Sequence, residues 1–148
     1  MSIIFSRQCE YALQSVLFLA LKDKDELVSI KEFNETLKIP FHFLAKILQD
    51  LTHKGLLKSH KGPTGGFSLA MPAKDITLLH IIESIDGLGF MNNCVLGFPE
   101  CSEKHPCALH EQWEKSREGI YNVLENKNIE EMAYEMRKPQ YVVSNSDK

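Results

Sequence analysis

A glycine-rich run between two alternating segments is the feature of this 148-residue chain that most constrains its fold. Residues 57–61 and Phe67-Ser68-Leu69-Ala70 both alternate with the two-residue period of a β-strand. Between them lies Gly62-Pro63-Thr64-Gly65-Gly66, a strong turn signal, and Pro72 ends the pattern. The segment therefore predicts a β-hairpin with a loop longer than two residues.

Three helical patterns precede this hairpin. Apolar residues at three- and four-residue steps predict a first helix from about Arg7 to Lys22. Ser29 followed by Glu32 predicts a capping box at the start of a short second helix. Pro40 marks the start of a third helix that ends at Gly55. The inward residues of the second and third helices are Ile30, Phe33, Leu37, Leu44, Ile47, Leu48 and Leu51.

Three helices followed by a hairpin indicate a winged helix-turn-helix, a mainly α fold with a small β-hairpin wing (α+β) and the Gly62–Gly66 loop at the tip. This domain is expected over residues 1–87, and it includes a fourth helix capped by Thr77. Residues 88–106 read as an irregular loop, and long loops in compact proteins are usually functional.

A long helix is expected from Cys107 to about Glu125, and a short one near Ile129 to Met136, so that residues 107–138 form a dimerisation unit. The long helix carries a heptad-like seam that needs a partner surface. Residues 139–148 are mostly polar and are expected to be frayed. The seam residues expected at the dimer interface are Leu109, Trp113, Ile120 and Val123.

Local charge favours DNA as a partner. The whole chain has a net charge of −3, which argues mildly against nucleic acid, but residues 38–61 hold five lysines against one aspartate, a net charge of +4. Base edges in the major groove would face the N-terminal part of the third helix, and the wing would meet phosphates or the minor groove. The alternative is that these lysines only form a solvent-exposed face that does not contact DNA. The expected contact residues are Phe41, His42, Ala45, Lys46, Lys61 and Thr64.

The placement of the cysteines indicates metal or redox chemistry. Cys9 stands alone, whereas Cys94, Cys101 and Cys107 lie within fourteen positions. The N-terminus has no signal-peptide pattern and no apolar stretch approaches the length of a membrane span, so we expect a cytoplasmic protein and no membrane partner. In that reducing compartment, such a cluster favours metal or redox chemistry over a structural disulfide.

These motifs together resemble one family of regulators. Cys9-Glu10-Tyr11-Ala12-Leu13, the Lys61–Phe67 wing and the three-cysteine loop are similar to the winged-helix regulators of the IscR and NsrR type, the Rrf2 family. The similarity runs from about Ile4 to Met136. It implies a homodimeric transcription factor, commonly a repressor, with an iron–sulfur cluster that senses oxygen, nitric oxide, redox state or iron–sulfur supply.

The resemblance also implies a set of cluster ligands. Cys94, Cys101 and Cys107 would be the thiolate ligands. The Cys107, His110, Trp113 spacing of IscR nominates His110 as the fourth ligand, and Glu10 of the other subunit is the NsrR-like alternative. The cluster could be 2Fe–2S or 4Fe–4S. Two features depart from the family pattern. Cys9 is either a spare ligand or a small buried hydrophobe. The spacing between Cys94 and Cys101 is one residue longer than is common in the family.

The mechanism expected from this resemblance is a dimer with two wings on a pseudo-palindromic operator, in which the cluster state orders or releases the 88–106 loop. Two other readings stay open: a cluster-free thiol/disulfide regulator of the same fold, and a zinc-bound winged-helix interaction module. An enzyme is not expected, because no phosphate-cradling loop or nucleophile–base pair is visible.

Overall fold

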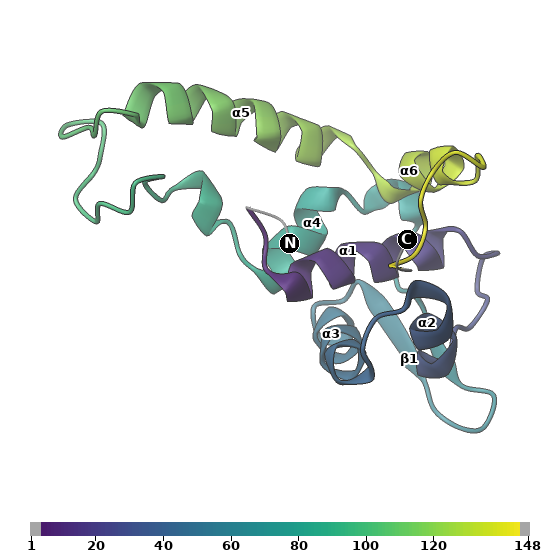
Figure 1. Ribbon diagram of the computed structural model, residues 1–148. Helices are drawn as coiled ribbons and strands as arrows, with labels where there is room; N and C mark the ends of the chain where they lie inside the picture. Colours follow the sequence, from purple (N-terminus) through teal and green to yellow (C-terminus); the bar gives the residue numbers. More distant parts are fainter. Residues whose placement is uncertain (1–3, 146–148) are drawn as a thin grey trace.

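The computed structural model describes residues 4–145, which form six α-helices and one two-stranded sheet (Figure 1). None of the described helices is both long enough and apolar enough to cross a membrane. The predicted class, a mainly α fold with a small hairpin, is confirmed. The elements are α1 (Arg7–Ala20), α2 (Ile30–Leu37), α3 (Phe41–His53), β1 (Leu57–His60), β2 (Gly66–Leu69), α4 (Leu78–Ile85), α5 (His110–Asn126) and α6 (Ile129–Met136), with 3-10 turns at Ala73–Asp75 and Gly89–Met91.

Helix α1 is the centre of the molecule. In Figure 1, α2, α3 and the hairpin lie on one side of it, and α5 and α6 lie on the other. The predicted apolar face of α3 is buried completely or nearly so, as are Phe33 and Leu37 of α2. These side chains pack against α1 to form the main core, so the helix-turn-helix pair is fixed to a rigid support.

The helix ends follow most of the sequence signals. Gly55 has a φ of +81°, a conformation that suits glycine, and it ends α3 as expected. Ser29 caps α2 by accepting from the Glu32 N–H at 3.2 Å. The full capping box predicted there is wrong: the Glu32 carboxylate accepts from Lys22 Nζ at 2.8 Å instead, because Lys22 at the end of α1 offers it a charged donor.

The wing is closed by backbone contacts that need glycine. Strands β1 and β2 pair from Leu57↔Leu69 to His60↔Gly66. Val28 extends this sheet, since its N–H donates to Phe67 O at 3.0 Å and its carbonyl accepts from the Phe67 N–H at 2.8 Å. A Cβ on Gly66 would stand 2.6 Å from Val28 O. The wing therefore holds the segment before α2 as well as its own two strands.

The C-terminal half of α5 packs on α4 through a second, smaller core, whereas the residue 88–109 loop extends from the rest of the molecule (Figure 1). Helix α5 begins at His110 rather than at the predicted Cys107. Cys107 instead opens a turn before the helix, because its carbonyl accepts from the His110 N–H at 3.1 Å while its own N–H donates to Cys101 Sγ at 3.3 Å.

The predicted frayed tail spans residues 139–148, of which residues 146–148 lie outside the described part of the chain. Described residues 139–145 form no helix or strand, but Asn145 is tied to the helical core. Its backbone N–H and its Nδ2 both donate to Leu37 O, at 2.9 and 2.7 Å, and its Nδ2 also donates to Gln14 Oε1. A polar sequence can therefore be held by hydrogen bonds alone, which a composition argument does not detect.

Candidate metal centre and nucleic-acid interface

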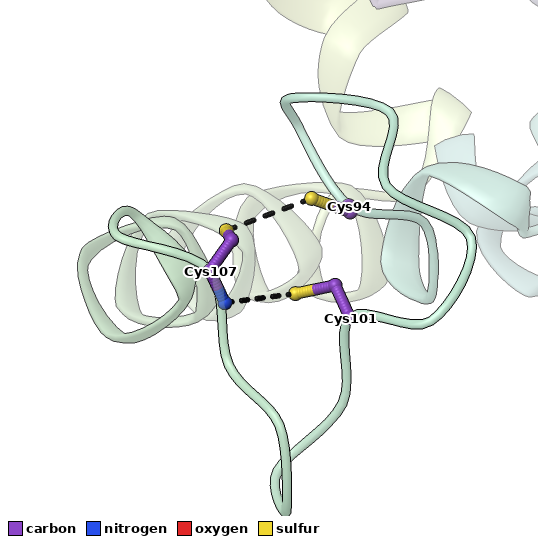
Figure 2. Close-up of side chains that lie close together, drawn as sticks. All are labelled: Cys94, Cys101 and Cys107. Atoms are coloured by element: carbon purple, nitrogen blue, oxygen red, sulfur yellow. Dashed lines mark hydrogen bonds between the residues drawn. The ribbon is translucent and has the colours of Figure 1, made fainter.

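The loop between α4 and α5 gathers the three clustered thiols (Figure 2). The Cys94 thiol donates to Cys107 Sγ at 3.6 Å, and Cys101 Sγ accepts from the Cys107 N–H at 3.3 Å. All three sulfur atoms lie within 4.8 Å of one another. The predicted grouping of Cys94, Cys101 and Cys107 is therefore present in the folded chain.

Turns in the loop explain how cysteines so far apart in sequence meet. The Gly97 N–H donates to Cys94 O at 3.0 Å, and Gly97 has a φ of +82°, which reverses the chain after Cys94. The Cys101 N–H then donates to Phe98 O at 3.2 Å. A further turn between Ser102 and His105 returns the chain to Cys107.

His110 lies beside the thiols at the start of α5. Its Nδ1 is 3.3 Å from Cys101 Sγ, and its Nε2 is buried with no hydrogen-bond partner among the described residues. A buried nitrogen without a partner is available as a ligand. Glu10, the alternative ligand, lies on α1, where its carboxylate is 3.8 Å from Arg7 Nη1, and it is not part of the thiol group of its own chain.

The surroundings of the thiols shift their pKa values in opposite directions. Burial raises the pKa of Cys94, but the backbone N–H groups of Phe98 and Leu96 and the neighbouring thiols outweigh it and bring this pKa down to about 7. For Cys101, the Cys107 N–H lowers the pKa, while burial and the adjacent thiols raise it above its ordinary value. One thiolate is thus favoured within a group of three.

Cys9 has a different environment. It is fully buried in the second core beside Leu79, Ile82 and Leu124. Burial first, and then the nearby Asp86 carboxylate, raise its pKa to about 12. A thiol that stays protonated in an apolar cluster is a packing residue, and Cys9 is outside the group of close thiols.

The cavity beside the thiols includes residues that sequence reasoning missed. Asn92, Asn93, Val95 and Arg117 line it together with Trp113. Trp113 was predicted as a seam residue and as part of the Cys107, His110, Trp113 spacing, but not as a residue that lines this cavity. Arg117 lies one helical turn beyond Trp113 on the same face of α5, and this spacing is the sequence signal that could have identified it.

The proposed DNA-reading surface is exposed as a whole. Phe41 is 59% exposed, and His42, Ala45 and Lys46 follow it on the open face of α3. Lys61 and Thr64 are exposed at the wing. Lys38 has a φ of +60°, and Ile39 O accepts from Asn34 Nδ2 at 2.7 Å, which together hold the turn that sets α3 against α2.

The four residues of the proposed seam have two different surroundings. Leu109 and Val123 are 44% and 58% exposed. Ile120 packs against the second core and Trp113 against the thiol cavity. Of these four residues of the single chain, Leu109 at the N-cap of α5 and Val123 within it therefore expose the most apolar surface.

Comparison with known proteins decides the family. The family described as Rrf2, iron-dependent transcriptional regulator, matches residues 5–135. The chain belongs to the Rrf2 family. It is thus a helix-turn-helix transcriptional regulator that binds DNA, and not an enzyme.

Individual relatives cover most of this Rrf2 chain. It is 30% identical to the HTH-type transcriptional regulator NsrR of Oceanobacillus iheyensis over 83% of this chain and 84% of that one. The structure of CymR, the global cysteine regulator of B. subtilis, matches with a TM-score of 0.77 and 26% identity, over 90% and 98% of the two chains. T. potens IscR matches with a TM-score of 0.74 and 25% identity, over 96% and 93%.

The donor set fits an iron–sulfur cluster. Thiolates are the usual protein ligands of such clusters, and the three close sulfurs supply three donors. His110 is not part of this close group of three, but its Nδ1 is 3.3 Å from Cys101 Sγ and its Nε2 has no hydrogen-bond partner among the described residues, so its imidazole is the nearby candidate for a fourth donor.

Proposed function

We propose that this Rrf2 protein is a homodimeric regulator whose operator binding is controlled by an iron–sulfur cluster held by Cys94, Cys101, Cys107 and His110. The observation that carries the proposal is the convergence of three thiols within 4.8 Å beside the His110 imidazole, whose Nε2 is buried. Repression is the proposed direction of control, and the cytoplasm is the proposed setting.

The cluster would supply reactivity toward oxygen, nitric oxide or redox change. The chain supplies the connection to the rest of the molecule, because Cys107 and His110 join the loop directly to α5. When the ligands hold a bound group, the loop is restricted to one arrangement, and release of the group restores the other conformations of the loop. A difference of a few kcal/mol between two arrangements is enough for a usable switch.

Helix α5 would carry this change to the reading heads. Leu109 and Val123 expose apolar surface along α5, and a second copy of the helix would bury it beside Trp113 and Ile120. Since the other end of α5 packs on α4, and α4 packs on α1 and α3, a change at the loop can alter the angle between two α3 helices. Their spacing must be near one turn of DNA, about 34 Å.

The DNA contacts are proposed from exposure and chemistry. His42 and Lys46 on α3 can donate to purine acceptors, and Ala45 can contact a thymine methyl group. Phe41 lies at the same end of the helix. Lys61 and Thr64 at the wing are placed for phosphate contacts.

The test is metal content after purification without oxygen. We expect a brown protein with matching iron and sulfide, and a colourless one when Cys94, Cys101 and Cys107 are all replaced by alanine. Cys9→Ala is the matched control, because it removes the one thiol outside the group. A wild-type protein without iron and sulfide after reconstitution would refute the proposal, and a colourless protein with bound zinc would favour the zinc module.

A thiol switch is the second candidate. Cys94 Sγ and Cys107 Sγ are 3.6 Å apart, so a small movement would bring them to bonding distance. An oxidant such as peroxide would accept two electrons as the two thiols lose their protons and form one disulfide. Mass spectrometry of the iron-free protein would detect this loss of two hydrogens, and Cys94→Ser would prevent it.

A further inference from the structure

Helix α5 carries three polar side chains that each have one buried nitrogen without a hydrogen-bond partner among the described residues. His110 Nε2, Trp113 Nε1 and Arg117 Nε are each buried without a hydrogen bond in the described part of the chain. Their spacing of three and then four residues places them on one face of the helix. All three residues line the cavity that the three cysteines also line.

Of these three residues, Arg117 is the one whose burial most requires a partner. The residue is only 9% exposed, and its guanidinium has N–H donors but no acceptor. No carboxylate of residues 4–145 lies within 4.0 Å of it. Glu111, on the same helix, pairs with Lys115 instead. A buried Nε of a charged guanidinium without a partner is costly, so an anion is the occupant that this position fits.

The thiols are the source of that anion. Ligation of a metal or cluster requires thiolates, and three thiolates at Cys94, Cys101 and Cys107 would add three negative charges, of which an oxidised iron–sulfur core with a charge of +2 would offset two, so the bound group would stay negative. A neutral His110 contributes none. Arg117 and Trp113 line the same cavity as the three cysteines, so they are near the charge that ligation would create.

We propose that Arg117 is the positioning residue that balances the negative charge of the thiolate-bound group, with the Trp113 Nε1–H as a second donor to it. This inference rests on the proposed function, since it assumes that the three thiolates hold a cluster. It adds a specific role for two residues of α5 that are not ligands. Residues around a metal site tune the affinity and the potential of the group within it.

The test compares three variants of the full-length protein. Arg117→Met keeps the length of the side chain and removes the charge, and Arg117→Lys keeps the charge. Lys115→Met is the matched control, because it removes one cation from an exposed position of the same helix. The readouts are the rate of iron loss to a chelator, the midpoint reduction potential, and the thermal midpoint of the metal-free protein.

We expect Arg117→Met to lose iron roughly 10–100-fold faster than wild type. Its cluster should be harder to reduce. We expect the midpoint reduction potential to fall by about 59 mV, which for a one-electron couple is a tenfold change in the oxidised-to-reduced ratio. The metal-free variant should unfold at a higher temperature than metal-free wild type, since an unpaired buried charge is gone. Arg117→Lys and Lys115→Met should keep the wild-type potential.

The outcomes separate the two proposals. A wild-type protein that takes up no iron and sulfide refutes the proposed function and this inference together. A loaded Arg117→Met variant with the wild-type potential and iron-loss rate refutes the inference alone. An Arg117→Met variant whose metal-free dimer dissociates, while its potential is unchanged, also overturns the inference and assigns Arg117 to a carboxylate of a second chain.

Discussion

Gly66→Ala is expected to destabilise the wing although it adds only one methyl group. The new Cβ would stand 2.6 Å from Val28 O, 2.7 Å from Val28 C and 3.1 Å from Ser29 N. All three are backbone atoms, so no flexible side chain can move aside. The bridge between Val28 and Phe67 must therefore open.

The expected magnitude follows from that bridge. It consists of two hydrogen bonds of 2.8 and 3.0 Å, and each such bond contributes about 0.5–1.5 kcal/mol net. Alanine also restricts the unfolded chain more than glycine does, which raises the free energy of unfolding by about 0.4–1 kcal/mol. The free energy of unfolding should therefore fall by about 1 kcal/mol.

Gly119→Ala is the matched control, because the two variants have the same composition. Gly119 is exposed within α5, and a Cβ there meets nothing within 4 Å. Alanine is favoured over glycine in a helix by about 1 kcal/mol, so this variant should be more stable than wild type. Urea unfolding at one fixed protein concentration measures both changes. A Gly66→Ala variant at least as stable as Gly119→Ala would refute the close approach of the hairpin to Val28.

Three further predictions concern single residues. Lys61→Ala should weaken DNA binding and reduce the slope of log affinity against log salt by about 1.8, since a dimer loses two phosphate contacts; fluorescence anisotropy measures the slope, and an unchanged slope would remove Lys61 from the phosphate contacts. Cys9→Ala should lower the free energy of unfolding by about 1 kcal/mol in chemical denaturation while iron and sulfide content stay constant; a loss of iron would instead make Cys9 a ligand. Val123→Asp should convert the dimer to a monomer in analytical ultracentrifugation, because it places a charge on the exposed seam, and an intact dimer would exclude that face of α5.

The fold was predictable because its signals are local. The apolar spacing of α3, the Gly55 stop and the Gly62–Gly66 turn each depend on neighbouring residues, and each is present in the structure. The wrong details involve distant partners. Glu32 pairs with Lys22 across the gap between two helices, and Asn145 binds Leu37 from the far end of the chain.

Prediction of the site shows the same division between signals from neighbouring residues and contacts that only the folded chain makes. Three cysteines within fourteen positions predicted a shared site, and the loop turns bring them together. Arg117 was missed because an arginine on an amphipathic helix is ordinarily exposed, and only the packed structure shows it to be buried without a partner. Trp113 was assigned to the seam because spacing alone does not say which neighbour fills a helix face.

The central claim is that the group bound by the cysteines controls DNA binding. The most direct test is operator affinity measured without oxygen for the cluster-loaded protein, the metal-free protein and the Cys94, Cys101 and Cys107 triple alanine variant, on a DNA fragment retained in a genomic selection. We expect loaded and metal-free wild type to differ by roughly tenfold or more, which corresponds to about 1.4 kcal/mol of coupling, and the triple variant to match the metal-free protein whether or not iron is supplied. Equal affinity for all three would contradict the account.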